Sequence, residues 1–177
     1  MWDEKSGSEV PAVREVTIFD LLNMTSGITY PDETTEPGRR MQAVVEGLVR
    51  RRMQGEWVDT QEYMRGIAGV PLVFQPGERW MYGFSADVLG GVVEKIAGVS
   101  YGEFLRREIF EPLNMPDTGF FVPEDKRGRF AQHYEPAEGG VLVPHVGSHL
   151  GEYYGEDVAF ESGGAGLVST LDDYSHF

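Results

Sequence analysis

The interpretation of this chain depends on a nine-residue run, Phe74-Gln75-Pro76-Gly77-Glu78-Arg79-Trp80-Met81-Tyr82. Pro76-Gly77 is a turn signal, so the run changes direction before it reaches its aromatic end. A pattern of apolar residues at helical spacing follows from about Ser85 to Ala97. The run therefore places Tyr82 just ahead of a helix, and we expect Trp80 to pack beneath this segment as a hydrophobic anchor.

The helix over 85–97 is the clearest element in the sequence. Its predicted buried stripe consists of Val88, Leu89, Val92, Val93 and Ile96. Gly90 and Gly91 lower the helix propensity, so we expect them to permit close packing against a neighbouring element. Gly98 is expected to end the helix.

Capping and turn signals predict several further helices. They begin near Thr17, Pro37, Asp59, Ser100 and Ser169. Ile18, Leu21 and Leu22 give the first of them one apolar face. From 120 to 160 the pattern is that of loops, with short extended pieces around Val141. The sequence thus predicts a mainly α fold with a few short strands.

Composition limits the kinds of function that fit. The chain has 177 residues, which suits a single domain with a real core, and 41% of them are hydrophobic. The formal net charge of −14 argues against nucleic acid and anionic membranes as partners, because both bind basic surfaces. The absence of cysteine excludes disulfides, thiolate metal sites and a cysteine nucleophile.

The sequence gives little information on location. No apolar run reaches the roughly 20 residues that a membrane helix needs. Residues 1–10 are polar and acidic, unlike a signal peptide. The compartment is left open between bacterial cytoplasm and periplasm.

Four segments, taken in chain order, resemble motifs of the serine β-lactamase-like hydrolases. They span 17–28, 74–98, 104–120 and 161–177. In the first, Met24 stands where the family usually has histidine. This superfamily includes class C β-lactamases, DD-peptidases and family VIII carboxylesterases. The resemblance implies the helical domain of a β-lactamase/transpeptidase-like fold.

In these enzymes the nucleophile comes from a Ser-x-x-Lys motif, and no serine of this chain is followed three residues later by lysine. The resemblance places that motif before Met1 and a Lys-Thr-Gly-type strand after Phe177. We therefore expect residues 1–177 to be a single domain cut from a longer α/β plus helical serine hydrolase, and inactive alone. The alternative is a non-catalytic binding module that keeps the helical fold.

The resemblance implies that Tyr82 is the catalytic tyrosine, acting as general base or proton relay beside the serine. A free phenol has a pKa near 10, so it becomes a useful base only when nearby cations stabilise the phenolate. The family supplies those cations from the segments this chain lacks. The alternative is a structural tyrosine at a helix start with its hydroxyl in water.

Phe84 is the predicted substrate-binding residue. β-Lactamases and DD-peptidases of this superfamily have the pattern Tyr-x-Asn, and its asparagine contacts the substrate amide. A phenyl ring cannot form those hydrogen bonds, so Phe84 favours esters over β-lactams. The alternative is that Phe84 turns into the core.

The expected partners are the missing α/β part and a small-molecule ester or amide, with self-association through an exposed apolar face as a further expectation. No cofactor is implied. The four histidines, His133, His145, His149 and His176, are scattered, so no metal site is predicted. The glycines of Ser162–Gly166 are not followed by the Lys-Ser or Lys-Thr of a phosphate loop, and we expect them to allow close backbone packing.

Overall fold

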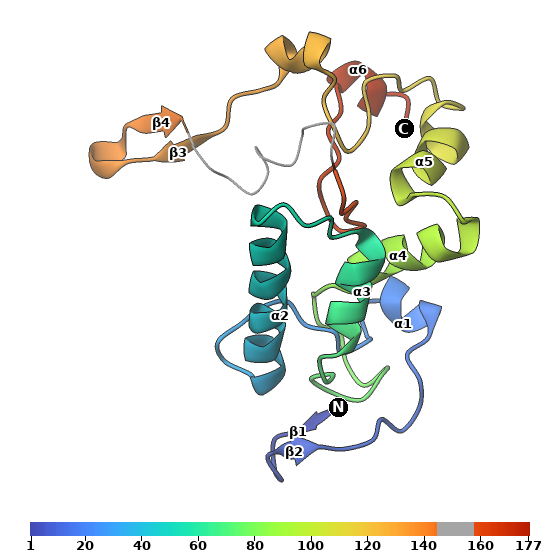
Figure 1. The fold of residues 1–177 in the computed structure, drawn as a ribbon, viewed down its shortest axis with the longest axis vertical. Helices are drawn as coiled ribbons and strands as arrows, with labels where there is room; N and C mark the ends of the chain where they lie inside the picture. Colours follow the sequence, from blue (N-terminus) through green and yellow to red (C-terminus); the bar gives the residue numbers. More distant parts are fainter. Residues whose placement is uncertain (145–157) are drawn as a thin grey trace. The chain divides into compact units, whose positions relative to one another are not determined.

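The computed structural model describes residues 1–144 and 158–177. Their contacts divide the chain into two compact units (Figure 1). The first unit consists of Met1–Tyr101 and Ala159–Ala165, and the second of Gly102–Val158 and Gly166–Phe177. Residues 73–84, which we name the tyrosine segment, therefore belong entirely to the first unit.

The first unit contains a short hairpin and four helices. These are β1 (Trp2–Asp3), β2 (Ser8–Glu9), α1 (Ile18–Leu22), α2 (Glu36–Met53), α3 (Thr60–Ala68) and α4 (Ser85–Ala97). The two strands pair antiparallel. Helix α3 packs against both α2 and α4, and α1 packs against α4 (Figure 1). Helix α4, which follows the tyrosine segment, is thus held by two neighbouring helices.

The predicted helix starts are confirmed where a side chain caps the first turn. Thr17 forms a complete capping box with Asp20 at the start of α1. Thr35 caps α2, with Pro37 in the first turn, and Asp59 accepts a hydrogen bond from the Glu62 amide in α3. Local polar chemistry therefore sets these boundaries.

The core of the first unit includes two apolar clusters. One contains Met41, Ile67 and Val70, and the other contains Leu48, Val58 and Tyr63. The Tyr63 ring stacks on Phe160, with ring centroids 4.0 Å apart. These contacts join α2 and α3 into one layer.

The prediction for the buried stripe of α4 is wrong in part. Its fully buried positions are Ser85, Asp87, Gly90 and Gly91, whereas Ile96 is 82% exposed. The reason is close packing: a Cβ atom on Gly91 would lie 2.4 Å from Met64 Cγ. The prediction that these glycines permit close packing is confirmed. In α1, likewise, Leu21 is buried but Ile18 and Leu22 are exposed.

The second unit has shorter elements. They are α5 (Tyr101–Leu105), the π-helical turn η1 (Arg106–Phe110), the 3₁₀ turns η2 (Glu124–Arg129) and η3 (Glu138–Gly140), the hairpin β3 (Tyr134–Pro136) and β4 (Leu142–Pro144), and α6 (Leu171–Tyr174). Gly119 and Val168 form an isolated antiparallel bridge. The cap of α6 is Thr170 and not Ser169, because the Thr170 hydroxyl accepts from the Asp173 amide.

The predicted fold class is confirmed: the described residues are mainly helical, and their strands are short. Within the residues described, none of the helices combines the length and the apolar character needed to span a bilayer.

Candidate active site

The tyrosine segment lies along the loop that follows α1 and is fastened to it by three backbone hydrogen bonds. The amides of Val73, Gly77 and Met81 donate to the carbonyls of Gly27, Thr25 and Met24 at 2.9, 2.8 and 2.8 Å. Backbone bonds of this kind fix the path of both partners. The first and second segments of the family resemblance are therefore direct packing partners.

Glycines allow the loop and the tyrosine segment to approach closely. A Cβ atom on Gly27 would lie 2.7 Å from the Phe74 carbonyl oxygen, and Gly27 also has a positive φ of 82°. A Cβ atom on Gly83 would lie only 2.1 Å from the Ile28 carbonyl oxygen. Gly83 stands between the two predicted site residues, so their position depends on the absence of a side chain there.

A buried pair of hydroxyls joins the loop to the first residue of α4. Ser26 Oγ and Ser85 Oγ are 2.8 Å apart, and both residues are at most 1% exposed. Ser26 Oγ also accepts from the Ile28 amide at 3.1 Å. The two hydroxyls satisfy each other in a place that water does not reach.

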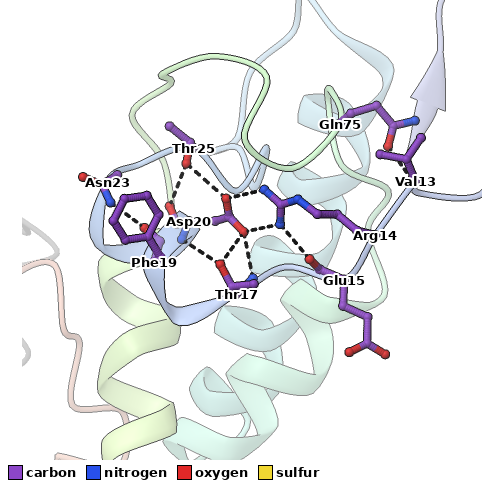
Figure 2. A network of polar contacts seen from close by, with 9 residues as sticks. All are labelled: Val13, Arg14, Glu15, Thr17, Phe19, Asp20, Asn23, Thr25 and Gln75. Carbon is purple, nitrogen blue, oxygen red and sulfur yellow. Dashed lines mark hydrogen bonds and ion pairs between the residues drawn. The ribbon is translucent and has the colours of Figure 1, made fainter.

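A second polar network supports the loop from the side of α1 (Figure 2). The Arg14 guanidinium donates to both carboxyl oxygens of Asp20, at 2.6 and 2.8 Å. The Thr17 amide and hydroxyl donate to Asp20 Oδ2, and the Thr25 hydroxyl donates to Oδ1. The Arg14 guanidinium also lies under the turn, since a Cβ atom on Gly77 would be 2.4 Å from Arg14 Nη2.

The buried carboxyl of Asp20 is therefore fully partnered. The Arg14 guanidinium holds the pKa of Asp20 well below its ordinary value; burial opposes this effect and the Thr17 hydrogen bonds reinforce it. Asp20 remains a carboxylate over the whole range of ordinary pH. It joins the N-terminal segment, α1 and the Pro76-Gly77 turn.

Tyr82 itself stands at the surface. Its side chain is 56% exposed, and its ring meets the Tyr30 ring edge-on, with centroids 5.4 Å apart at 72°. Such edge-to-face contacts orient a ring without burying it. The backbone beside Tyr82 is fixed, while more than half of its side chain is exposed.

Phe84 forms the cap position of α4 and points towards the core. It packs against the cluster of Met41, Ile67 and Val70, and it meets the Tyr30 ring edge-on at 4.4 Å. It is half-buried. This geometry agrees with the core alternative, although the side chain is not fully buried.

Tyr30 is a site residue that the sequence did not reveal. It contacts both Tyr82 and Phe84. Burial, followed by the negative charge of Asp87 and by Tyr82, raises the pKa of Tyr30 to about 12. Tyr30 therefore stays a neutral phenol at any ordinary pH. The only signal in the sequence was an aromatic residue just ahead of Pro31.

Trp80 corrects an expectation. Its side chain is 66% exposed, so it does not anchor the tyrosine segment. The anchor is Phe74, which is 2% exposed and has the Arg79 guanidinium 4.7 Å above its ring centroid.

The fourth matched segment also reaches this site. Its first part, 162–165, forms a turn against the first turn of α4, where the Ser162 hydroxyl donates to Asp87 Oδ1. A Cβ atom on Gly163 would lie 2.1 Å from the Ala86 carbonyl oxygen, which confirms the predicted close packing of these glycines. Parts of three of the four matched segments thus meet at the first turn of α4.

Nothing in the described part of the chain gathers three or more metal-binding side chains. His176 lies with Nδ1 3.0 Å from the Asn114 carbonyl oxygen, and His133 stacks on Phe130. His145 and His149 are outside the described residues.

Comparison with known proteins identifies the family. The sequence profile described as Beta-lactamase matches residues 9–177. The chain belongs to the Beta-lactamase family. The recognised resemblance to serine β-lactamase-like hydrolases is thereby confirmed.

Among the relatives in this family, some have names that state an esterase activity and others have names that state no activity. Protein Rv1367c of Mycobacterium tuberculosis is 33% identical over 167 residues, covering 94% of this chain and 39% of that protein. Esterase EstB of Burkholderia gladioli is 31% identical over 171 residues, covering 89% of this chain and 42% of that protein. The chain spans about two fifths of the length of these relatives.

The fold of the Beta-lactamase family is also found among solved structures. Simvastatin synthase from Aspergillus terreus matches with a TM-score of 0.69 and 24% identity, over 99% of this chain and 41% of that one. This likeness shows that the helical chain adopts a part of the β-lactamase-like fold.

Proposed function

We propose that this chain is one domain of a serine hydrolase of the Beta-lactamase family, and that it forms the wall of the catalytic cleft bearing the tyrosine. The observation that carries the proposal is Tyr82: its backbone is fastened on both sides, while its side chain is 56% exposed. A fixed backbone that carries an exposed side chain is what a proton-transfer residue at a cleft requires.

The reaction proposed is acyl transfer through an acyl-enzyme. A serine oxygen outside this chain attacks the carbonyl carbon of the substrate and gives up its proton, and the alcohol or amine leaves with a proton. Water then releases the acid. Tyr82 would accept the serine proton or relay it to the leaving group, with a lysine outside this chain as the neighbouring cation.

Esters are the proposed substrates, ahead of β-lactams. The phenyl ring of Phe84 offers no hydrogen bond to a substrate amide, and it lies beside Tyr30 in an aromatic wall. Relatives with the names Esterase EstB and Lovastatin esterase support the same choice. We propose that the accessible edge of Phe84 contributes to the acyl pocket.

Exposed apolar side chains support a contact with the rest of the enzyme. On α1, Ile18, Phe19 and Leu22 are 49%, 72% and 65% exposed. Apolar groups gathered on one short helix are typical of a surface that is covered in the full assembly. We propose that α1 faces the α/β part; a second copy of the chain is the other occupant that this surface fits.

The test compares two forms of the protein. Residues 1–177 alone, and a gene product extended on both sides to the length of the relatives, are assayed with p-nitrophenyl butyrate. The proposal predicts turnover by the extended form and none above background by the shorter one. Turnover by residues 1–177 that a serine-to-alanine change within this chain abolishes would overturn it.

A further inference from the structure

Asp87 is a buried acid that the proposed reaction does not use. It lies in the first turn of α4, five residues after Tyr82, and is 2% exposed. Its Oδ1 accepts from the Ser162 hydroxyl, while its Oδ2 has no hydrogen-bond partner in the described part of the chain. An unsatisfied carboxyl oxygen in the interior lowers stability, so its retention calls for an explanation.

Ser162 connects this carboxyl to the glycine turn. The amides of Gly164 and Ala165 donate to Ser162 Oγ at 3.1 and 3.0 Å. A hydroxyl has one hydrogen and two lone pairs, so Ser162 accepts from both amides and gives its hydrogen to Asp87. An uninterrupted set of hydrogen bonds therefore runs from the backbone of the turn to the side chain on the helix.

The turn and the helix are shaped to meet at this point. A Cβ atom on Gly164 would lie 2.9 Å from Asp87 Oδ2, and one on Gly90 would lie 3.2 Å from Gly163 Cα. Contacts this short leave no room for a side chain or for water between the two backbones. The carboxyl is thus enclosed by the turn that it holds.

We propose that Asp87 is a positioning residue: through Ser162 it fastens the 162–165 turn to the first turn of α4 and so fixes the backbone that presents Tyr82 and Phe84. The contact itself follows from the geometry. Its consequence for turnover rests on the proposed function.

The electrostatic environment of Asp87 agrees with this role. Among the described residues, the titratable groups that interact with it are two phenols, Tyr30 on the loop after α1 and Tyr101 at the start of α5. Burial raises the pKa of Asp87, and the hydrogen bond from the Ser162 hydroxyl opposes this effect. Burial and the charge of Asp87 in turn raise the pKa values of both phenols. The clamp needs only an acceptor oxygen at Oδ1, which a carboxylic acid or an amide also supplies.

The experiment measures hydrogen exchange of the Gly164 and Ala165 amides in four variants. Asp87→Ala and Ser162→Ala remove one end of the clamp each, Asp87→Asn keeps the acceptor, and Asp125→Asn is a control at an exposed acid. We expect hydrogen exchange to become about tenfold or more faster in the first two, because each change removes the hydrogen bond that fastens the turn to the helix. Asp87→Asn and Asp125→Asn should exchange like the wild type.

A double variant separates the clamp from general loosening. Asp87→Ala combined with Ser162→Ala should quicken exchange no more than either change alone, because both act on one contact. Wild-type exchange in Ser162→Ala, or exchange in Asp87→Asn as fast as in Asp87→Ala, would overturn the clamp. Ser162→Ala removes only a hydroxyl, so this arm remains informative if Asp87→Ala fails to fold.

Kinetics of the extended protein with p-nitrophenyl butyrate test the positioning role. Asp87→Ala should lower kcat with little change in KM, and Asp87→Asn should restore it. An unchanged kcat in Asp87→Ala, together with faster exchange, would overturn the positioning role. If the wild-type protein hydrolyses no ester, the proposed function fails, while the exchange measurements still decide whether the clamp exists.

Discussion

Asp20 and Asp87 are two acids in the same unit, and each is 2% exposed. They differ in their hydrogen-bond partners and in the direction in which their pKa values are shifted. Asp20 is surrounded by donors and faces the Arg14 guanidinium, whereas Asp87 has one hydroxyl donor and an unpartnered oxygen. Their pKa values are accordingly shifted in opposite directions. Burial alone does not decide the state of a carboxyl; its partners do.

The difference distinguishes a network that only supports the structure from a site that we connect with function. The Asp20 network has every group satisfied, as a structural support should (Figure 2). The Asp87 site is incomplete, and it lies on the helix that follows Tyr82. Departures from full satisfaction are most often found near functional sites.

The largest effect is expected from removing Asp20. Asp20→Ala deprives Arg14, Thr17 and Thr25 of their common acceptor, and we expect a loss of roughly 2–3 kcal/mol in the free energy of unfolding, less than for a fully buried pair because Arg14 can return to water. Urea unfolding followed by circular dichroism measures it. Glu15→Ala, at an exposed neighbouring acid, is the control, and equal stability of the two variants would show that the network contributes nothing.

Gly83 tests the close approach that positions the tyrosine segment. Gly83→Ala places a methyl group against the Ile28 carbonyl, and we expect a loss of about 1–3 kcal/mol from overpacking. Gly47→Ala in α2 meets nothing within 4 Å and should instead stabilise the chain by roughly 0.5–1 kcal/mol through helix propensity. Thermal unfolding of both variants measures the two changes in stability. A change of the same sign in both variants would contradict this prediction.

The two acids should also give opposite dependences on pH. The folded-state pKa of Asp20 is depressed, so its contribution is present above the unfolded value of about 3.9 and is lost as the pH falls through the folded value. The folded-state pKa of Asp87 is raised, so the wild type loses stability as the pH rises from about 4 through that value.

Urea unfolding of Asp20→Asn and Asp87→Asn from pH 4 to pH 8 checks these signs. Relative to the wild type, Asp87→Asn should gain stability as the pH rises. Asp20→Asn should be less stable than the wild type throughout this range, with a deficit that shrinks only in stronger acid. A difference between Asp87→Asn and the wild type that does not vary with pH would contradict the raised pKa.

Much of this architecture could be predicted from the sequence because local chemistry sets it. The bounds of α4 follow from apolar spacing and from Gly98, which adopts the left-handed conformation at its end. The capping box of Thr17 and Asp20 could be predicted from the sequence. The ion pair of Asp20 with Arg14 could not, because it depends on how the segment before α1 folds back.

Other features depend on packing that sequence patterns do not encode. Ile96 and Trp80 are exposed because no other element in the described part of the chain packs over them. The spacing of apolar residues does not predict which side chains are covered in this way. Asp87 is an acid in the first turn of a helix, where negative charge is favourable and gives no sign of burial. Its burial arises from a turn that lies 75 residues further along the chain.

The most direct test of the account is Tyr82→Phe, which removes one hydroxyl and keeps the ring against Tyr30. In the extended protein we expect the rate of ester acylation to fall by about 10²–10⁴-fold, the usual contribution of general acid–base catalysis. In residues 1–177 the free energy of unfolding should stay within about 0.5 kcal/mol of the wild type, because the side chain is exposed. Stopped-flow acylation and urea unfolding measure the two effects. An unchanged acylation rate, or a chain that unfolds on loss of this hydroxyl, would contradict the assignment of Tyr82 to chemistry.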